Sequence, residues 1–259
     1  MTMHLPTPEP VPDTPAQRAA DLHRWRRAFN ASLAFVLLLA AVYSAQGGFD
    51  VRAWALQPWA WDGWRGLLAA PLLHGSFEHV AANALSLLAL GTLAGGLYPR
   101  ATLRALPLMW LGSGLGAWLL GAPGTFHLGA SGVTHGLMFL VFVLGLLRRD
   151  RPSVAAAMIA FLLHGSMLLT ILPHEAGVSW QSHMGGAAGG VLGALLWRLA
   201  DPLPPRKRYS WELEDELEAV PAHDELEPPA PRDVPVLWHR PGTTDDRGAV
   251  LPFRPRRDD

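Results

Sequence analysis

The sequence predicts an all-α polytopic membrane protein with six membrane-spanning helices. Of its 259 residues, 50% are hydrophobic and only 17% are charged, whereas soluble domains carry about 25% charged residues. Residues 105–147 contain no Lys, Arg, Asp or Glu, and Glu175 is the only such residue within 152–197. Long apolar segments that are almost free of charge are typical of helices that cross a bilayer.

The rest of the composition narrows the classes of partner and chemistry. The net charge of -1 at pH 7 gives no electrostatic reason to expect a nucleic-acid partner. Cys is absent, which excludes disulfides, thiolate nucleophiles and metal sites built on Cys. We therefore expect a lipid bilayer, and no nucleic acid, among the partners of this chain.

Six segments have roughly the 17–25 residues that a helix needs to cross the hydrocarbon core; they are 29–45, 78–98, 102–121, 131–147, 154–172 and 180–199. Together they predict a six-helix membrane domain over residues 28–200. Residues 1–27 begin with a Pro-rich stretch and predict a disordered leader. Residues 201–259 are first acidic and then Pro-rich, so we expect a disordered tail.

The basic residues predict the orientation of the spans. In a six-span scheme nearly all of them near the spans fall on one side: Arg24, Arg26, Arg27, Arg100, Arg104, Arg148, Arg149, Arg151, Arg198, Arg206, Lys207 and Arg208. Only Arg52 and Arg65, in the loop after the first span, break the pattern. Because Lys and Arg are enriched in cytoplasmic loops, both termini are expected in the cytoplasm, and the fourth span begins near the outer face.

The loop after the first span, residues 47–77, is rich in tryptophan. It contains Trp54, Trp59, Trp61 and Trp64. Tryptophan side chains are enriched where the membrane meets water. We therefore expect this loop to lie in the interface rather than in bulk water.

A serine stands at the start of the fourth span, within the run Gly129-Ala130-Ser131-Gly132. Serine in a transmembrane helix usually packs against a neighbour or bonds back to a carbonyl. Here Gly129 and Gly132 leave space around the hydroxyl, and the first N–H groups of a helix have no intrahelical partners, so they can stabilise an oxyanion. This setting favours Ser131 as a nucleophile.

A serine nucleophile needs a base, and three histidines are candidates. His127 lies just before the fourth span. His135 follows Ser131 by four residues and so lies on the same helix face. His183 begins the sixth span. Spacing alone leaves all three open.

Two glycines favour His183 among these candidates. Gly186 and Gly190 form a small-xxx-small face one turn after His183, and such a face allows two helices to approach closely. If the sixth span packs on the fourth through this face, His183 can reach Ser131. The same glycines would also serve ordinary helix packing.

A second pair of polar residues lies on the second span. His79 and Asn83 are four residues apart and share one helix face. Both can donate hydrogen bonds, as an oxyanion site requires, although either alone would more often be a structural polar group. Together, near the outer end of the span, they indicate a polar pocket that faces Ser131.

Metal binding is the main alternative chemistry for these histidines. The chain has no H-E-x-x-H motif, and the run from His74 to His79 is one residue too long for the inverted H-x-x-E-H form. Asp and Glu, the usual carboxylate partners, are almost absent from the spans. We therefore expect neither a metal site nor a cofactor.

These residues together resemble the rhomboid family of intramembrane serine proteases over roughly residues 64–200. The similarity lies in four motifs in this order: Trp64-Arg65, His74-Gly-Ser-Phe-Glu-His79-x-x-x-Asn83, Gly129-Ala-Ser131-Gly132 and His183-x-x-Gly186-x-x-x-Gly190. The resemblance implies a six-helix rhomboid-like bundle in the bacterial inner membrane, active as a monomer and without a cofactor.

The resemblance also implies a role for each matching residue. Ser131 would be the nucleophile and His183 the general base, in a dyad without an aspartate. His79, Asn83 and the Ser131 backbone N–H would form the oxyanion hole. Trp64-Arg65 would belong to an interfacial loop that braces the fold, and the fifth span would be a lateral gate for transmembrane substrates.

One position departs from the common family pattern. Many members have Tyr four residues after the serine, packed on the catalytic histidine, and here this residue is His135. The Ser-Gly-Val-Thr-His-Gly form is more similar to rhombosortase-like bacterial members, which process C-terminally anchored surface proteins. The expected function is intramembrane proteolysis near the outer face. The alternatives are an inactive relative that binds transmembrane clients, or a polytopic metalloenzyme or transporter.

Overall fold

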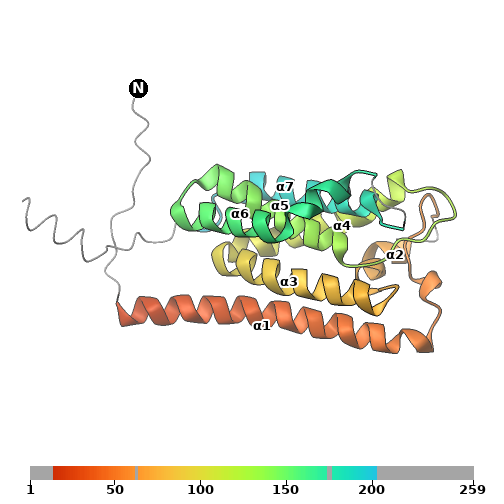
Figure 1. The fold of residues 1–259 in the computed structure, drawn as a ribbon, viewed down its shortest axis with the longest axis horizontal. Coiled ribbons are helices and arrows are strands. Elements are labelled where there is room, and N and C mark those ends of the chain that lie inside the picture. Colours follow the sequence, from red (N-terminus) through yellow and green to blue (C-terminus); the bar gives the residue numbers. More distant parts are fainter. Residues whose placement is uncertain (1–13, 62–63, 174–176, 203–259) are drawn as a thin grey trace, which may run out of the picture. The chain divides into compact units, whose positions relative to one another are not determined.

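A computed structural model describes residues 14–61, 64–173 and 177–202 of the chain. All of these belong to one compact unit, residues 1–208. The described residues contain no strand and form seven α-helices (Figure 1): α1 (Pro15–Ala45), α2 (Trp64–Ala69), α3 (Phe77–Leu97), α4 (Pro99–Leu120), α5 (Ser131–Arg148), α6 (Arg151–His164) and α7 (Trp180–Trp197). Short 3-10 helices join them: η1 (Gln46–Gly48), η2 (Val51–Ala53), η3 (Ala70–Leu72) and η4 (Gly165–Ile171). The predicted all-α class is confirmed.

Five described segments are long and apolar enough to cross a membrane: Pro15–Gly48, Phe77–Leu97, Pro99–Leu120, Ser131–Arg148 and Arg151–Ile171. They correspond to the first five predicted spans. α7 is not among them, because glycine and polar residues make up much of its sequence. The chain is thus a multi-pass membrane protein, and the sixth span stays a prediction.

The first helix begins earlier than expected. α1 starts at Pro15, so the disordered leader predicted for residues 1–27 is wrong from residue 15 onward; residues 1–13 lie outside the described residues. The Thr14 hydroxyl accepts a hydrogen bond from the Gln17 backbone N–H at 3.2 Å, and Pro15 has the φ angle that suits a first helical position. A capped start followed by good helix formers such as Ala and Arg explains the extension.

The membrane domain also ends later than expected. Asp201, assigned from sequence to the disordered tail, is only 5% exposed. Its carboxylate accepts hydrogen bonds from the backbone N–H groups of Arg100 at 3.0 Å and Ala101 at 2.9 Å. These are the first N–H groups of α4, which lack partners within the helix. Asp201 therefore caps α4 from a distant part of the chain. The rest of the predicted tail, residues 203–259, lies outside the described residues.

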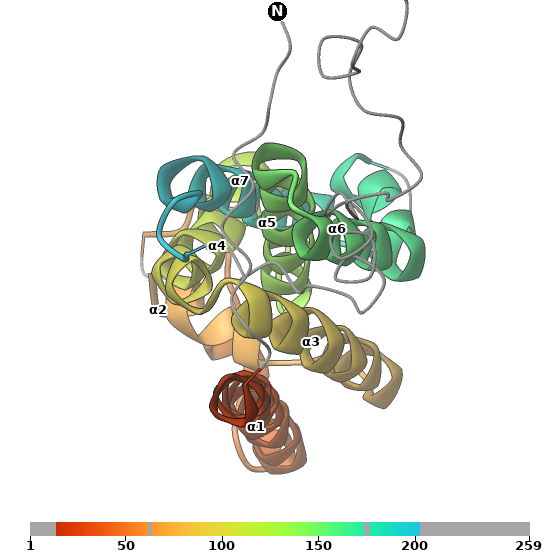
Figure 2. The same cartoon turned by 90° about the vertical axis from the view of Figure 1, so that its left-hand side faces the viewer.

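α5 lies at the centre of the bundle, in contact with α3, α4, α6 and α7, and α7 packs against both α4 and α5 (Figure 2). On the α4 side, a Cβ added at Gly185 would collide with the backbone of Gly112, and one at Gly189 with Leu108. The helices thus meet backbone to backbone. This close contact explains how α7 can pack tightly against its neighbours with so few large apolar side chains.

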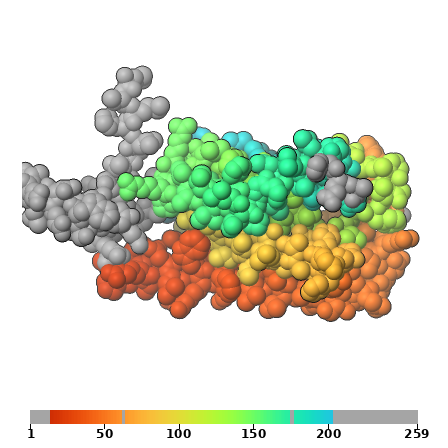
Figure 3. Space-filling model, in the orientation of Figure 1, coloured from red at the N-terminus to blue at the C-terminus, as the bar shows by residue number. Residues whose placement is uncertain are grey.

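The outer helices α1 and α6 pack on α3 and α5. α1 packs along α3, and α6 packs on α5; Figure 3 shows these layers on one face of the molecule, with α3 between α1 and α6. α6 carries exposed apolar side chains such as Ile159, Leu162 and Leu163. Exposed apolar surface of this kind fits contact with lipid.

Candidate active site

Ser131 and His183 meet at the outer end predicted for the bundle. Ser131 is the first residue of α5, and His183 lies in the first turn of α7. The Ser131 Oγ and the His183 Nε2 are 2.9 Å apart, which is hydrogen-bond distance. His183 is buried and Ser131 is half-buried. The two residues come from helices whose starts are 49 positions apart in the chain, at 131 and 180.

The contact made by the other ring nitrogen of His183 determines which of the two nitrogens carries the proton. Nδ1 lies 3.0 Å from the backbone carbonyl of Thr170, in η4. Because a carbonyl only accepts, Nδ1 must carry the proton, and Nε2 is left with the lone pair that faces the Ser131 hydroxyl. A backbone carbonyl here performs the orienting role that an aspartate performs in a Ser-His-Asp triad.

His135 lies directly against His183. The two rings stack with centroids 3.9 Å apart and an interplanar angle of 13°. His135 Nδ1 donates to the Ser131 carbonyl at 2.6 Å, and its Nε2 lies 2.8 Å from the Thr170 hydroxyl. Since Nδ1 holds the proton, the neutral ring presents an acceptor at Nε2 to the Thr170 hydroxyl, whose single proton also faces the Met167 carbonyl at 3.1 Å. One residue, Thr170, therefore contacts both histidines, through its carbonyl and its hydroxyl.

Glycines hold the two helices of this pair together. A Cβ at Gly186 would collide with the carbonyl of Gly132, and one at Gly190 with the carbonyl of Gly136. Glycine at these positions is therefore required for the present separation of α5 and α7. The glycine face predicted for the sixth span lies against α5, one turn beyond the Ser131–His183 contact.

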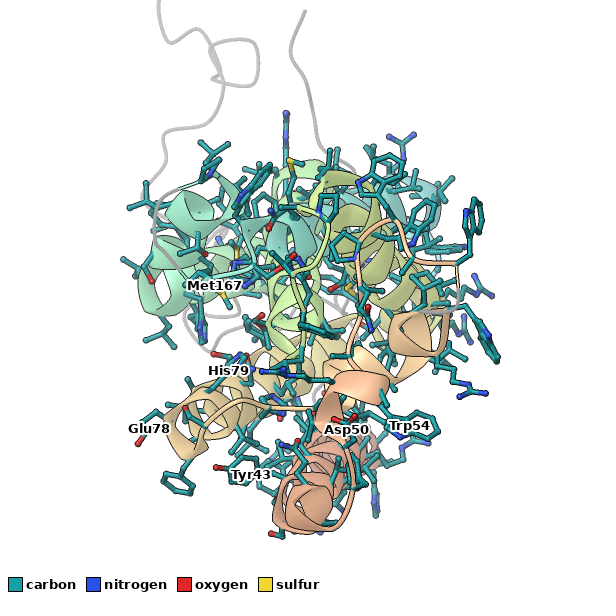
Figure 4. The ribbon with its side chains drawn as sticks, turned by 90° about the vertical axis from the view of Figure 1, so that its right-hand side faces the viewer. Tyr43, Asp50, Trp54, Glu78, His79 and Met167 are labelled. Atoms are coloured by element: carbon teal, nitrogen blue, oxygen red, sulfur yellow. The ribbon has the colours of Figure 1, made fainter. Side chains whose placement is uncertain are left out.

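His79 and Asn83 of α3 lie against the loop that leads to Ser131. A Cβ at Gly129 would be 2.5 Å from His79 Cε1 and 3.7 Å from Asn83 Nδ2. Gly129 also has φ +116°, a value that disfavours every other residue. Figure 4 shows His79 directed into the bundle, while its neighbour Glu78 points outward.

His74 contributes to this side of the site, although the sequence predicts no role for its side chain there. It is 1% exposed, and its Nε2 lies 3.0 Å from Asn83 Nδ2 and 3.4 Å from the Ala130 N–H. Burial, and to a lesser extent the nearby His79, lower the pKa of His74 to about 4. At neutral pH the ring therefore accepts one Asn83 hydrogen, and the second hydrogen of the amide stays available.

His127, the remaining candidate base, is engaged elsewhere. Its Nδ1 is 2.5 Å from the Ser179 hydroxyl and its Nε2 is 3.0 Å from the Thr125 hydroxyl. Its backbone pairs in both directions with Leu56, each time at 2.9 Å. Ser179 precedes α7 and caps it, so His127 ties two loops to the start of that helix.

Trp64 and Arg65 open the short helix α2. Trp64 is 59% exposed, and the Arg65 guanidinium lies 6.0 Å from the centre of the Trp54 ring in the same loop. Close packing comes instead from the next residue, because a Cβ at Gly66 would collide with the backbone of Leu56. The Gly66–Leu56 contact thus folds the loop onto itself, and α2 packs on α4, where a Cβ at Gly114 would be 2.8 Å from the Leu67 side chain.

The described residues contain no group of three His, Asp or Glu side chains arranged to hold a metal ion.

Thr170 was not identified from the sequence. No local pattern marks a threonine whose backbone carbonyl, rather than its side chain, holds the His183 ring.

One known protein family matches more than half of this chain. The family described as Rhomboid domain matches residues 60–199, which contain Ser131, His183, His79 and Asn83. The chain belongs to the rhomboid family. The rhomboid match covers all helices from α2 to α7 and leaves α1 outside.

Relatives of this rhomboid protein occur in mycobacteria. Uncharacterized proteins of Mycobacterium bovis and Mycobacterium tuberculosis are each 33% identical over 207 residues, which cover 75% of this chain and 85% of theirs. An uncharacterized protein of Mycobacterium leprae is 34% identical over 139 residues, or 51% of this chain and 55% of its own. The similarity to the first two extends beyond the rhomboid domain itself.

Proposed function

We propose that this rhomboid protein is an intramembrane serine endopeptidase that cleaves transmembrane-anchored proteins with a Ser131–His183 dyad. The observation that carries the proposal is the 2.9 Å contact between Ser131 Oγ and His183 Nε2, together with the 3.0 Å contact that places the His183 proton on Nδ1. A serine with a correctly oriented neutral base can be activated as a nucleophile.

The reaction begins when the Ser131 Oγ attacks a substrate carbonyl carbon and His183 Nε2 takes the hydroxyl proton. The negative charge that forms on the carbonyl oxygen is stabilised by His79, Asn83 and the Ser131 backbone N–H. The C–N bond then breaks as His183 gives its proton to the leaving amine, which leaves an acyl-serine. A water molecule, deprotonated by His183, hydrolyses the ester and restores Ser131.

The substrate enters between α3 and α6. A lateral cavity of about 340 Å³ lies between these helices, lined by residues such as Leu88, Ile159 and Leu163. α6 ends at His164 and gives way to the 3-10 helix η4, so this part of the wall lacks the continuous α-helical ladder of its neighbours. A substrate helix must unwind before its carbonyls are accessible. We therefore expect small or helix-breaking residues near the cleavage site.

The proposed setting is the inner membrane of a bacterium, with both termini cytoplasmic and the Ser131 end of α5 toward the outer face. The distribution of Arg and Lys supports this orientation. His135, stacked on His183 at 3.9 Å, supports a subclass of the rhombosortase-like kind, whose substrates are anchored near their C-termini. A monomer contains all the residues that the mechanism uses.

Two variants test the proposal, measured with a reporter protein that contains one transmembrane segment. Ser131→Ala and His183→Ala should each abolish cleavage and labelling by a fluorophosphonate probe, while yield and thermal stability stay close to those of the unaltered protein. The control is Ser44→Ala, which removes an exposed hydroxyl bonded to Ala40 on α1. Full cleavage by Ser131→Ala would exclude the dyad.

An inactive rhomboid that binds transmembrane clients is the second candidate function. It would give no fluorophosphonate labelling in the unaltered protein and equal client binding in the Ser131→Ala variant. The hydrogen-bonded and correctly oriented Ser131–His183 pair favours the protease.

A further inference from the structure

A second and larger cavity lies on the opposite side of α3 from the proposed entry route. Its volume is about 960 Å³, and its wall is formed by α1, α3, α4 and one edge of α5. It exists because α1 packs mainly beside α3 (Figure 2) and meets α4 through the rings of Phe35 and Trp110, whose centroids are 5.9 Å apart. Sites that bury small ligands usually have roughly 300–1,000 Å³. The cavity is therefore large enough for a ligand.

The wall of this cavity is polar at one end and apolar along the rest. Arg24 and Arg27 line the polar end from successive turns of α1, and Thr102 faces it from the start of α4. The apolar part is lined by residues that include Phe35, Leu106, Trp110 and Leu137. The basic end lies on the side predicted to face the cytoplasm.

Polar atoms at this end lack partners among the described residues. Thr102 is 8% exposed, yet its Oγ1 has no hydrogen bond there, and neither does the Arg24 Nε. The Arg24 Nη2 does pair with Asp21, at 3.1 Å. Burying a hydroxyl without a partner is costly, and here it faces a cavity. The two positive charges and the free hydroxyl together point to a ligand rich in negatively charged oxygen acceptors.

We propose that this cavity binds an anionic phospholipid, with its phosphate between Arg24 and Arg27 and an acyl chain along the apolar wall. Guanidinium groups recognise phosphate oxygens by paired hydrogen bonds, and the Thr102 hydroxyl can donate to a phosphate or ester oxygen. The cavity reaches Val133 and Leu137 on the back of α5, but the body of that helix separates it from His183. The ligand is therefore not a peptide substrate of Ser131, and the proposal does not depend on proteolysis.

Charge also argues against the other occupants of such a groove. A second copy of the chain, placed symmetrically, would bring the Arg24 and Arg27 of both copies toward each other. A zwitterionic lipid would fill the apolar wall equally well but would bring its own positive group near the two arginines. An anionic headgroup is the occupant that the charges favour.

The test measures how much lipid the full chain retains in detergent, by native mass spectrometry. The two probes are dioleoyl phosphatidylglycerol and dioleoyl phosphatidylcholine, which share acyl chains and differ in headgroup charge. We expect stronger retention of phosphatidylglycerol. The double variant Arg24→Gln, Arg27→Gln should weaken it roughly 25-fold, since each basic residue near a lipid phosphate contributes about fivefold. The matched control is Arg26→Gln, because Arg26 is exposed on the same helix and does not line the cavity.

A second pair of variants tests the apolar part. Ala31 lines the cavity, whereas Ala34, one turn later, does not. Ala31→Trp should fill the space and reduce retention of both lipids, and Ala34→Trp should change neither. Equal retention of the two lipids, or an equal loss in Arg26→Gln, would overturn the phosphate site. Unchanged binding in Ala31→Trp, or a dimer that this variant dissociates, would overturn the assignment of the cavity to lipid.

Discussion

Replacing Gly186 by Ala perturbs the contact that sets the distance between α5 and α7. A methyl group at this position would lie 3.0 Å from the Gly132 Cα and closer still to the Gly132 carbonyl. Ordinary contacts of a Cβ begin at 3.4 Å, so the helices must separate by at least 0.4 Å at the Cα and by more at the carbonyl. The obstacle is backbone on both sides, and no rotamer change can relieve it.

The size of the effect follows from the Ser131–His183 distance. A separation of about 1 Å would lengthen the 2.9 Å contact to roughly 3.9 Å, beyond hydrogen-bond range. Misplacement of a reacting group by about 1 Å typically costs on the order of 100-fold in rate. We therefore expect the kcat of Gly186→Ala to fall about 100-fold, with a lowered melting temperature because backbone packing is lost.

The assay is cleavage of a single-span reporter in proteoliposomes, together with the rate of fluorophosphonate labelling. Both should fall in parallel, because both require the same serine and base. Gly48→Ala is the control, since a Cβ there meets nothing within 4 Å. If Gly186→Ala cleaves and labels as fast as the unaltered protein, the helix spacing does not control the dyad, and the reasoning is refuted.

Three further changes test other contacts of the site and fold. Thr170→Val removes the hydroxyl that His135 Nε2 faces at 2.8 Å but keeps the backbone carbonyl. We expect kcat to fall about tenfold with little change in KM. An unchanged kcat would show that the Thr170 hydroxyl does not support the site through His135. Because the pKa of His74 is lowered to about 4, the unfolded chain binds its proton more tightly, so stability should fall as the pH drops from 6.5 toward 4. His74→Gln should lose this part of the pH dependence of the melting temperature, and an identical profile would count against it. Asp201→Ala removes the carboxylate that accepts from Arg100 and Ala101, which should cost about 1 kcal/mol of stability without altering kcat at low temperature; an equal melting temperature would show that the cap is dispensable.

Features that depend on residue type along one helix could be predicted from the sequence. The apolar segments predict the first five spans to within a few residues, apart from the start of α1, because lipid contact requires apolar side chains along the whole length of a helix. α7 carries few of them, because the backbones of α4 and α5 cover it. Its place in the bundle therefore could not be derived from hydropathy, although Gly186 and Gly190 indicate close packing.

Several contacts between distant segments could not be predicted, in contrast to the contact of Ser131 with His183. Asp201 is one acidic residue at the start of an acidic, Pro-rich tail, and nothing near it in sequence indicates that it caps α4. Thr170 holds His183 through its backbone carbonyl, a group that every residue possesses. The role of His74 depends on where Asn83 and Ala130 lie in space. In each case the contacting group is at least nine residues away in the sequence, or it is a backbone group that does not depend on residue type.

The position of Thr170 has a consequence for the timing of the proposed reaction. Ser131 and His183 stand on helices locked by glycine, but the carbonyl that keeps His183 in its productive tautomer belongs to η4, beside the entry route. If that wall moved aside to admit a helix, Nδ1 would lose its acceptor and the stacked His135 would lose its hydroxyl partner. The proposed base would then be free to rotate or to change tautomer. Such an enzyme would be inactive while open and active only after it closes over its substrate. In the open state, Ser131 would lack an oriented base and would not react with lipid esters.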